Sequence, residues 1–152
     1  MMVLNTMDTR LVAPHLLHLE GGRPALLGSR CSACGEVCFP AARGCTRCCG
    51  TQLAAFELGD RARLWSWTVQ GFRPKPPYDG AGTEADFVPY GVGYVEMACG
   101  IKVESRLTLA DPARLRIGMD MELVLEPYRQ DADGAAVHTY AFRPVHGEQG
   151  GT

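Results

Sequence analysis

Apolar and polar residues follow two different periods along the chain. Residues 9–19 (TRLVAPHLLHL) place apolar side chains near helical spacing, so they predict a short helix or helix-turn that Gly21 and Gly22 close. From residue 53 onward the period becomes two, which is typical of β-strands. We predict strands at 61–70, 90–97, 101–109, 120–128 and 137–144.

Turn residues separate these predicted strands. The ACG at 98–100 indicates a hairpin, and between the third and fourth strands Asp111 can cap one helical turn that Pro112 starts. This layout matches a small Greek-key barrel such as the OB-fold, with a small sandwich as the alternative. The connection 71–87 holds three prolines and three glycines, and a loop of that length is usually functional or disordered.

Composition favours a globular protein of the cytoplasm. The 152 residues are 46% hydrophobic and 21% charged, with a formal net charge of −2. No apolar run approaches the roughly 20 residues that cross a bilayer, and the N-terminal sequence lacks the pattern of an export signal. We therefore expect reduced thiols, and the odd number of cysteines, 7, argues against a fully paired disulfide framework.

Six of the seven cysteines lie between residues 30 and 50. They include two Cys-x-x-Cys pairs, and each pair can offer two sulfurs to one ion while backbone N–H groups spread the thiolate charge. The spacing predicts a tetrahedral Zn²⁺ site whose ligands are Cys31, Cys34, Cys45 and Cys48.

Alternatives to this ligand set remain open. Gly35 supplies the positive φ that the first turn needs, whereas Cys49 takes the corresponding place in the second turn. Cys45 with Cys49 is therefore an alternative pair, and Cys38 is a more remote candidate. Iron in a rubredoxin-like electron-transfer role would use the same four ligands.

The predicted ion has a structural role. Residues 22–51 contain few large apolar side chains, so burial cannot offset a chain entropy of about 1–2 kcal/mol per residue. Structural zinc sites contribute apparent binding free energies of about 10–16 kcal/mol, and four thiolates leave no open coordination position. His15 and His18 lack a third ligand nearby and Cys99 lacks an activating histidine, so we predict no catalytic residue in this chain.

Five segments occur in a specific order: LLGSRCSACGEVCFPAARGCTRC, LWSWTV, VPYGVGYVEM, IGMDMELVLEP and YAFRP. Over roughly residues 10–145 they resemble the zinc-ribbon/OB-fold family of acyl-CoA-associated small subunits, which includes the small subunits of benzoylsuccinyl-CoA-type thiolases. The chain departs from the family pattern at Thr46, where proline is usual, and at Cys49, where glycine is usual.

The resemblance implies a mainly β protein with an N-terminal helix, a rubredoxin-like zinc ribbon and a C-terminal five-stranded OB-fold barrel. We expect an N-terminal helical arm at 1–22, the ribbon at 23–52, the OB-fold at 53–146 and a disordered tail at 147–152. The resemblance also implies a non-catalytic subunit of a heteromeric acyl-CoA thiolase, in a heterotetramer whose thiolase-fold chain carries the catalytic residues. A hydratase or an aldolase acting on CoA thioesters is the alternative partner.

Contact with an acyl-CoA would need arginine or lysine near its phosphates. The candidates are Arg73 and Lys75 in the long connection, and Arg61, Arg63 and Arg106 on predicted strands. The sequence leaves the acyl group open, with products of aromatic or steroid degradation among the possibilities.

A nucleic-acid-binding function is the alternative of a different class, because zinc ribbons and OB-folds both serve it. The ribbon carries four arginines against one glutamate, but a zinc ion with four thiolates would remove two units of that positive charge. Residues 86–126 hold seven acidic residues against four basic ones, so we expect no nucleic-acid partner.

Overall fold

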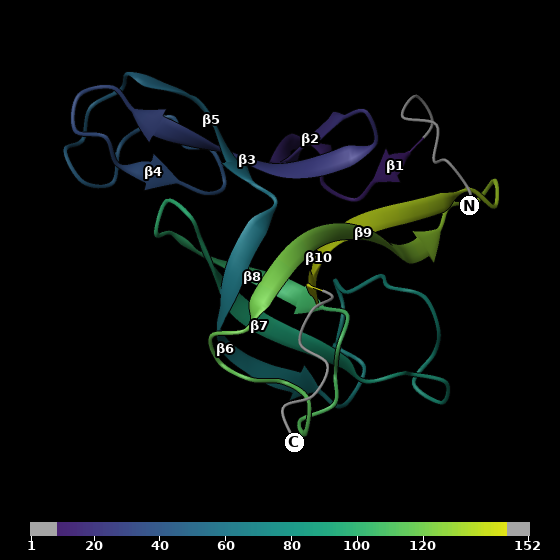
Figure 1. Cartoon of the computed structure of the whole chain (residues 1–152). Helices are drawn as coiled ribbons and strands as arrows, with labels where there is room; N and C mark the ends of the chain where they lie inside the picture. Colours follow the sequence, from purple (N-terminus) through teal and green to yellow (C-terminus); the bar gives the residue numbers. More distant parts are fainter. Residues whose placement is uncertain (1–8, 146–152) are drawn as a thin grey trace.

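The period-two segments form a closed barrel in the computed structural model, which describes residues 9–145 (Figure 1). Hydrogen-bonded neighbours follow the order β10-β8-β7-β6-β9, and β9 also pairs with β10, which closes the ring. The strands are β6 (Arg61–Gln70), β7 (Tyr90–Met97), β8 (Lys102–Leu107), β9 (Asp120–Gln130) and β10 (Ala136–Pro144). The predicted mainly β class and five-stranded barrel are confirmed, and the sandwich alternative is wrong.

Apolar side chains fill the barrel because successive residues of a strand point to opposite faces. The almost fully buried set includes Leu64, Val95, Met97, Leu107, Met121 and Phe142. Gly91 lies where two backbone segments approach closely, since a Cβ at this position would lie 2.3 Å from the carbonyl oxygen of Leu109. The barrel interior therefore selects the apolar pattern, and the close backbone approach selects glycine at position 91.

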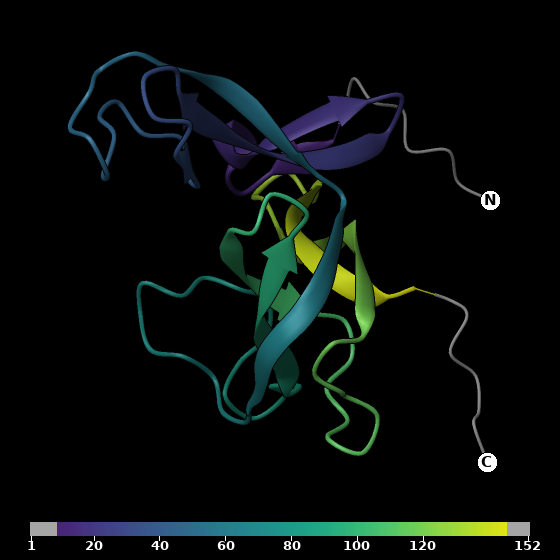
Figure 2. The ribbon, with the colours of Figure 1, turned by 60° about the vertical axis from the view of Figure 1, so that its left-hand side comes forward.

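A second sheet precedes the barrel. Its long strand β3 (Arg23–Cys31) pairs with β2 (Leu17–Glu20) and β4 (Val37–Cys38) along one edge and with β5 (Leu53–Gly59) along the other. Figure 2 shows β5 running along β3 and continuing directly into β6 of the barrel. This continuous stretch of chain connects the two sheets.

The predicted N-terminal helix is wrong. Residues 10 and 11 form a short strand, β1 (Arg10–Leu11), which pairs in parallel with β10, and Pro14–Leu16 form a single 3-10 turn. Leu17–Glu20 then pair with β3 because Gly21 and Gly22, at φ +56° and +78°, make a tight hairpin turn rather than a helix end. Burial also alternates along β2, as expected for a strand. The hydrogen bonds that β3 offers therefore favour a strand over a helix in this segment.

The chain passes from the second sheet to the barrel at Asp60, between β5 and β6. The division into a ribbon at 23–52 and an OB-fold at 53–146 stays a prediction about domains. The predicted tail at 147–152, and residues 1–8 of the predicted arm, lie outside the described residues. Within 9–145, no helix has the length and apolar character needed to cross a membrane.

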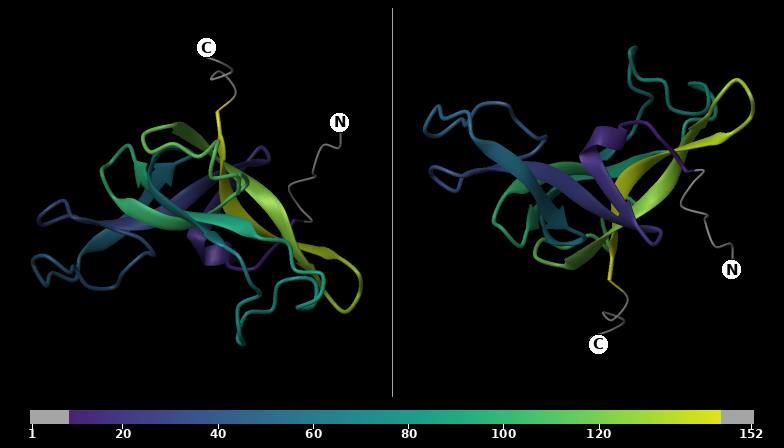
Figure 3. Two further views of the ribbon diagram at one scale, coloured as in Figure 1. Left: turned by 90° about the horizontal axis from the view of Figure 1, so that it is seen from below. Right: turned by 90° about the horizontal axis from the view of Figure 1, so that it is seen from above.

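The long connection 71–87 contacts the end of β9, just before the β9–β10 turn, and Figure 3 shows the two segments on the same side of the barrel. The N–H of Ala81 donates to the carbonyl of Tyr128 at 3.0 Å, and the Tyr128 hydroxyl donates to Asp79 at 3.0 Å. Within the loop, Arg73 donates to the carbonyl oxygens of Gly80 and Gly82 at 2.9 and 3.2 Å. The connection is therefore tied to the barrel rather than free.

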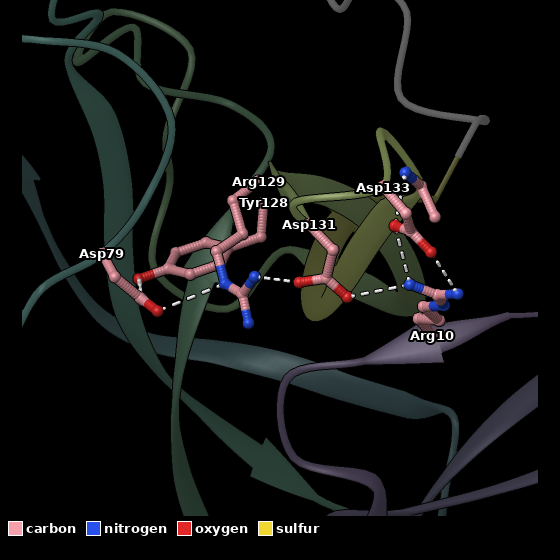
Figure 4. Close-up of polar contacts among 7 residues, drawn as sticks. Arg10, Asp79, Tyr128, Arg129, Asp131 and Asp133 are labelled. Carbon is pink, nitrogen blue, oxygen red and sulfur yellow. Dashed lines mark hydrogen bonds and ion pairs between the residues drawn. The ribbon is translucent and has the colours of Figure 1, made fainter.

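A chain of ion pairs extends this contact to the N-terminal strand (Figure 4). Arg129 lies between Asp79, at 3.2 Å, and Asp131. Arg10 of β1 then lies 3.1 Å from Asp131 and 2.7 Å from Asp133. Hydrogen bonds from Arg129 and Arg10 lower the pKa of Asp131. The connection 71–87, the β9–β10 hairpin and β1 therefore meet at one charged cluster, although they lie far apart in the sequence.

Candidate metal centre

Four cysteine sulfurs meet at the far end of the second sheet. The Sγ atoms of Cys31, Cys34, Cys45 and Cys48 all lie within 4.8 Å of one another. The Cys31–Cys48 and Cys34–Cys45 pairs are 3.7 and 3.5 Å apart. A tetrahedral metal with bonds of about 2.3 Å to sulfur requires sulfur–sulfur separations of about 3.8 Å, so the four sulfurs fit one ion.

Two similar turns present these sulfurs. In the first turn the N–H of Gly35 donates to the carbonyl of Cys31 at 2.9 Å, and in the second the N–H of Cys49 donates to that of Cys45 at 3.0 Å. Gly35 and Cys49 both have positive φ, at +79° and +59°. Cys49 therefore occupies the place that glycine holds in the first turn, in a conformation that is unfavourable for a residue with a side chain.

Backbone N–H groups of the two turns favour the thiolate form. The N–H groups of Cys48 and Arg47 donate to the Cys45 sulfur at 3.5 and 3.4 Å, and with them the pKa of Cys45 falls to about 7. The N–H groups of Cys34 and Ala33 likewise lower the pKa of Cys31. These donors therefore point at the sulfurs that sit deepest, because Cys31 and Cys45 are both buried.

Cys34 differs from Cys31 and Cys45, because its surroundings favour the neutral thiol. The N–H of Glu36 favours its thiolate, but burial and the sulfur of Cys45 outweigh that contact and raise the pKa of Cys34 to about 12. Four sulfurs this close cannot all ionise at neutral pH unless a cation compensates their charge. The chemistry of the donor set thus fits a metal ion with a preference for sulfur.

The other candidate ligands lie outside this cluster. Among residues 9–145 the group of potential metal ligands contains neither Cys38 nor Cys49. His18 pairs through Nδ1 with Glu57 at 3.2 Å, not with His15. Cys99 is exposed. Spacing in the sequence therefore selected four residues that the fold brings together, and the identity of the ion stays a prediction.

The structure separates the five predicted CoA contacts into two regions. Arg61 and Arg63 lie at the start of β6, 3.3 Å from Glu122 and 3.5 Å from Asp120 of β9. Arg73 follows the other end of β6, and a strand rises about 3.3 Å per residue. One CoA phosphate group cannot contact both ends of this strand.

The second region is the long connection and the barrel wall beneath it. Arg106 is half-buried, lies over the ring of Tyr90 at 3.8 Å and donates to Glu126 at 2.6 Å. Arg73 is occupied by the carbonyl groups of its own loop. Within 9–145, Lys75 is the only one of the three predicted contacts in this region that no hydrogen bond or ion pair holds.

The surface has two hollows that the sequence does not predict. One, of about 280 Å³, lies on the β6–β7–β8 face, where exposed Trp65 and Tyr94 meet edge to face at 6.4 Å. The other, of about 540 Å³, lies between the β2–β3 hairpin and the β5–β6 corner. Its charged and titratable lining residues are His18, Glu20, Arg23, Glu57, Asp60 and Arg61. Only the pairing of β2 and β5 with β3 gathers them, so no local motif could have revealed them.

Several known proteins are similar to this chain. The description of one family, the C-terminal OB-fold domain of ChsH2, matches residues 56–126. A DUF35 domain-containing scaffold protein of Methanothermobacter thermautotrophicus is 30% identical over 121 residues, which cover 78% of this chain and 86% of that protein. The benzoylsuccinyl-CoA thiolase subunit BbsA of Thauera aromatica is 27% identical over 140 residues, 91% of this chain and 90% of that protein.

A solved structure has the same fold. The chain of the Ltp2-ChsH2(DUF35) aldolase aligns with a TM-score of 0.58 and 24% sequence identity, over 79% of this chain and 84% of that chain. At this identity the likeness establishes the architecture only. It agrees with the OB-fold description of the barrel.

Replacing Cys45 by serine should abolish metal binding at this cluster. The variant lacks one of the four sulfurs, a thiol whose pKa the backbone N–H groups lower to about 7, so from one ion per chain expected in the wild type we predict less than a tenth in the variant. Elemental analysis of the purified proteins measures this. Cys38→Ser is the matched control and should keep the full metal content; a loss in the control would refute the ligand set.

Replacing Cys49 by glycine should stabilise the protein. A left-handed conformation costs a residue with a Cβ about 1–2 kcal/mol, so relief of φ +59° should raise the free energy of unfolding by about 1 kcal/mol. Urea denaturation at fixed metal concentration measures the change. Cys99→Gly, at a position without positive φ, should give no gain. Loss of metal from the Cys49 variant would instead identify Cys49 as a ligand.

Proposed function

This chain belongs to the DUF35 family, and on that premise we propose that it is a non-catalytic subunit of a heteromeric acyl-CoA thiolase. In this proposal a thiolase-fold partner carries the catalytic residues, and this chain organises the complex. The observation that carries the proposal is the four-sulfur cluster, whose geometry offers a metal a complete coordination shell.

Zinc is the ion that we propose for the cluster. Four thiolates form a soft donor set that suits zinc, and they leave no position for water or substrate. The four cysteines would hold the ion as a structural element, and no reacting group could reach it. Iron would use the same ligands, and a coloured protein with a one-electron couple would identify it.

The nature of the partner rests on the relatives. Two BbsA proteins, from Thauera aromatica and Geobacter metallireducens, are 27% and 25% identical to this chain, and each match covers 91% of it. Their name describes a thiolase subunit, so we prefer a thiolase-fold partner over a hydratase or an aldolase. We propose that the complex is a heterotetramer. We also propose that it lies in the cytoplasm, because a reducing compartment keeps the cysteines of the metal site free to bind the ion.

Contacts within the chain reduce the number of predicted basic residues that are available to bind CoA. Arg61, Arg73 and Arg106 are held by partners within the chain, whereas Lys75 has no partner among the described residues 9–145 and Arg63 makes a long, exposed contact with Asp120. Because Arg63 and Lys75 lie at opposite ends of β6, one CoA cannot use both, and we propose that Lys75 is the contact for its phosphate groups.

Affinity purification of the tagged full chain from its own cells, followed by mass spectrometry, tests the function. We expect one thiolase-fold chain to co-purify in a fixed ratio. Acyl transfer to or from CoA should require both chains, because the proposal places the catalytic residues on the thiolase-fold chain. Turnover by the isolated chain, or a stable complex without any thiolase-fold chain, would contradict the proposal.

Steady-state kinetics of the purified complex test the proposed CoA contact. Lys75→Ala should raise the KM for the CoA substrate several-fold and leave kcat unchanged, since the lysine would contact phosphate away from the reacting atoms. Lys102→Ala is the matched control, because Lys102 is engaged by Glu96 at 3.3 Å and lies over the ring of Trp65. Equal KM values for the two variants would exclude Lys75.

A further inference from the structure

Strand β5 has an open edge. It pairs with β3 on one side, and among residues 9–145 no strand pairs with its other side. The barrel strands close on one another, and β2 and β4 share the opposite edge of β3. With seven residues, β5 is the longest strand with one fully unpaired edge in the described part of the chain. Half of its main-chain N–H and C=O groups therefore lack a strand partner.

The first half of this edge lacks the features that normally block strand pairing. Proteins protect free edges with lysine, proline, charge or a bulge. Residues 53–56 read Leu-Ala-Ala-Phe, and both alanines are exposed. A register shift between Leu26 and Leu27 of β3 disturbs only the part of β5 from Glu57 onward. The unprotected stretch is the kind of edge to which another strand can add.

A charged hollow borders the other half of β5. Glu20, Glu57 and Asp60 line it together with Arg23. Arg61 also lines it, with its guanidinium 3.3 Å from Glu122, and His18 lines it with Nδ1 3.2 Å from Glu57. Three carboxylates therefore face two arginines and one histidine, and the volume of about 540 Å³ accommodates a long side chain.

We propose that an extended segment of the larger subunit adds to the free edge of β5, and that a lysine or arginine of this segment enters the hollow. The main chain of β5 supplies hydrogen bonds, and Glu20, Glu57 and Asp60 supply the charge that selects a basic residue. This inference rests on the proposed function, because the larger subunit is the thiolase-fold partner proposed above.

A second copy of this chain fits the edge less well. Residues 52–60 (QLAAFELGD) contain no lysine or arginine, so a self-paired β5 would bring no cation to the hollow. It would bring the carboxylate of another Glu57 instead. Charge complementarity therefore favours a different chain as the occupant.

Hydrogen exchange of the purified complex is the direct test. Amide protons of residues 53–57 should exchange at least tenfold more slowly in the complex than in the metal-loaded chain alone, because strand addition hydrogen-bonds the outward-facing N–H groups. Residues 61–63, already paired with β9, provide the internal reference. Equal exchange of 53–57 in a fully assembled complex would overturn the inference and leave the proposed function standing.

Lysine substitutions test the same edge by blocking it. A54K and A55K should each weaken association with the larger subunit at least tenfold. The matched control A113K, at an exposed alanine in the turn between β8 and β9, should change it less than twofold. Metal content and circular dichroism establish that each variant is folded. Unimpaired association of A54K and A55K would contradict the inference.

Two further outcomes distinguish a failure of the proposed function from a different occupant of the β5 edge. If the wild-type chain associates with no thiolase-fold subunit, the proposed function fails before the edge is tested. If the chain alone forms a dimer that A54K and A55K dissociate, the edge binds a second copy and the proposed occupant is wrong. Replacing Glu57 and Asp60 together, by E57Q and D60N, should weaken association with the larger subunit and reduce its dependence on salt.

Discussion

The mutual repulsion of four sulfur atoms is the constraint on which the ribbon depends. Cys31, Cys34, Cys45 and Cys48 can share a space of a few ångströms as thiolates only around a cation, and the backbone N–H groups that point at Cys45 prepare that state. The segment from 32 to 52 contributes little to the core apart from Val37 and Phe39, which pack against it. The proposed ion would therefore fix the two turns that apolar burial leaves without support.

The half of the second sheet nearest the barrel is held differently. Leu17, Leu26 and Leu58 belong to the same apolar cluster as the interior of the barrel, so β2, β3 and β5 share one core with it. Phe39 also meets Tyr140 of β10 edge to face at 6.4 Å. Burial thus anchors one end of β3, and metal ligation would anchor the other and make the ribbon a rigid extension of the barrel.

This arrangement leaves the functional surfaces where two sheets can support them. The free edge of β5 lies directly beside β3, the strand that carries Cys31. A metal bound at Cys31 would fix the end of β3 and, through the pairing, the start of β5 as well. An edge that is already ordered loses little entropy when another chain pairs with it.

Local spacing determined much of this protein. The two Cys-x-x-Cys pairs identified the four sulfurs that meet, and period-two alternation placed all five barrel strands, because both signals depend only on neighbouring residues. Local pattern failed at Leu17–Glu20, where apolar residues near helical spacing form a strand because β3 offers a hydrogen-bonding partner. Only the tertiary structure decided the free edge of β5, the hollow beside it and the ion-pair chain from Asp79 to Asp133, since each requires segments that the sequence keeps far apart.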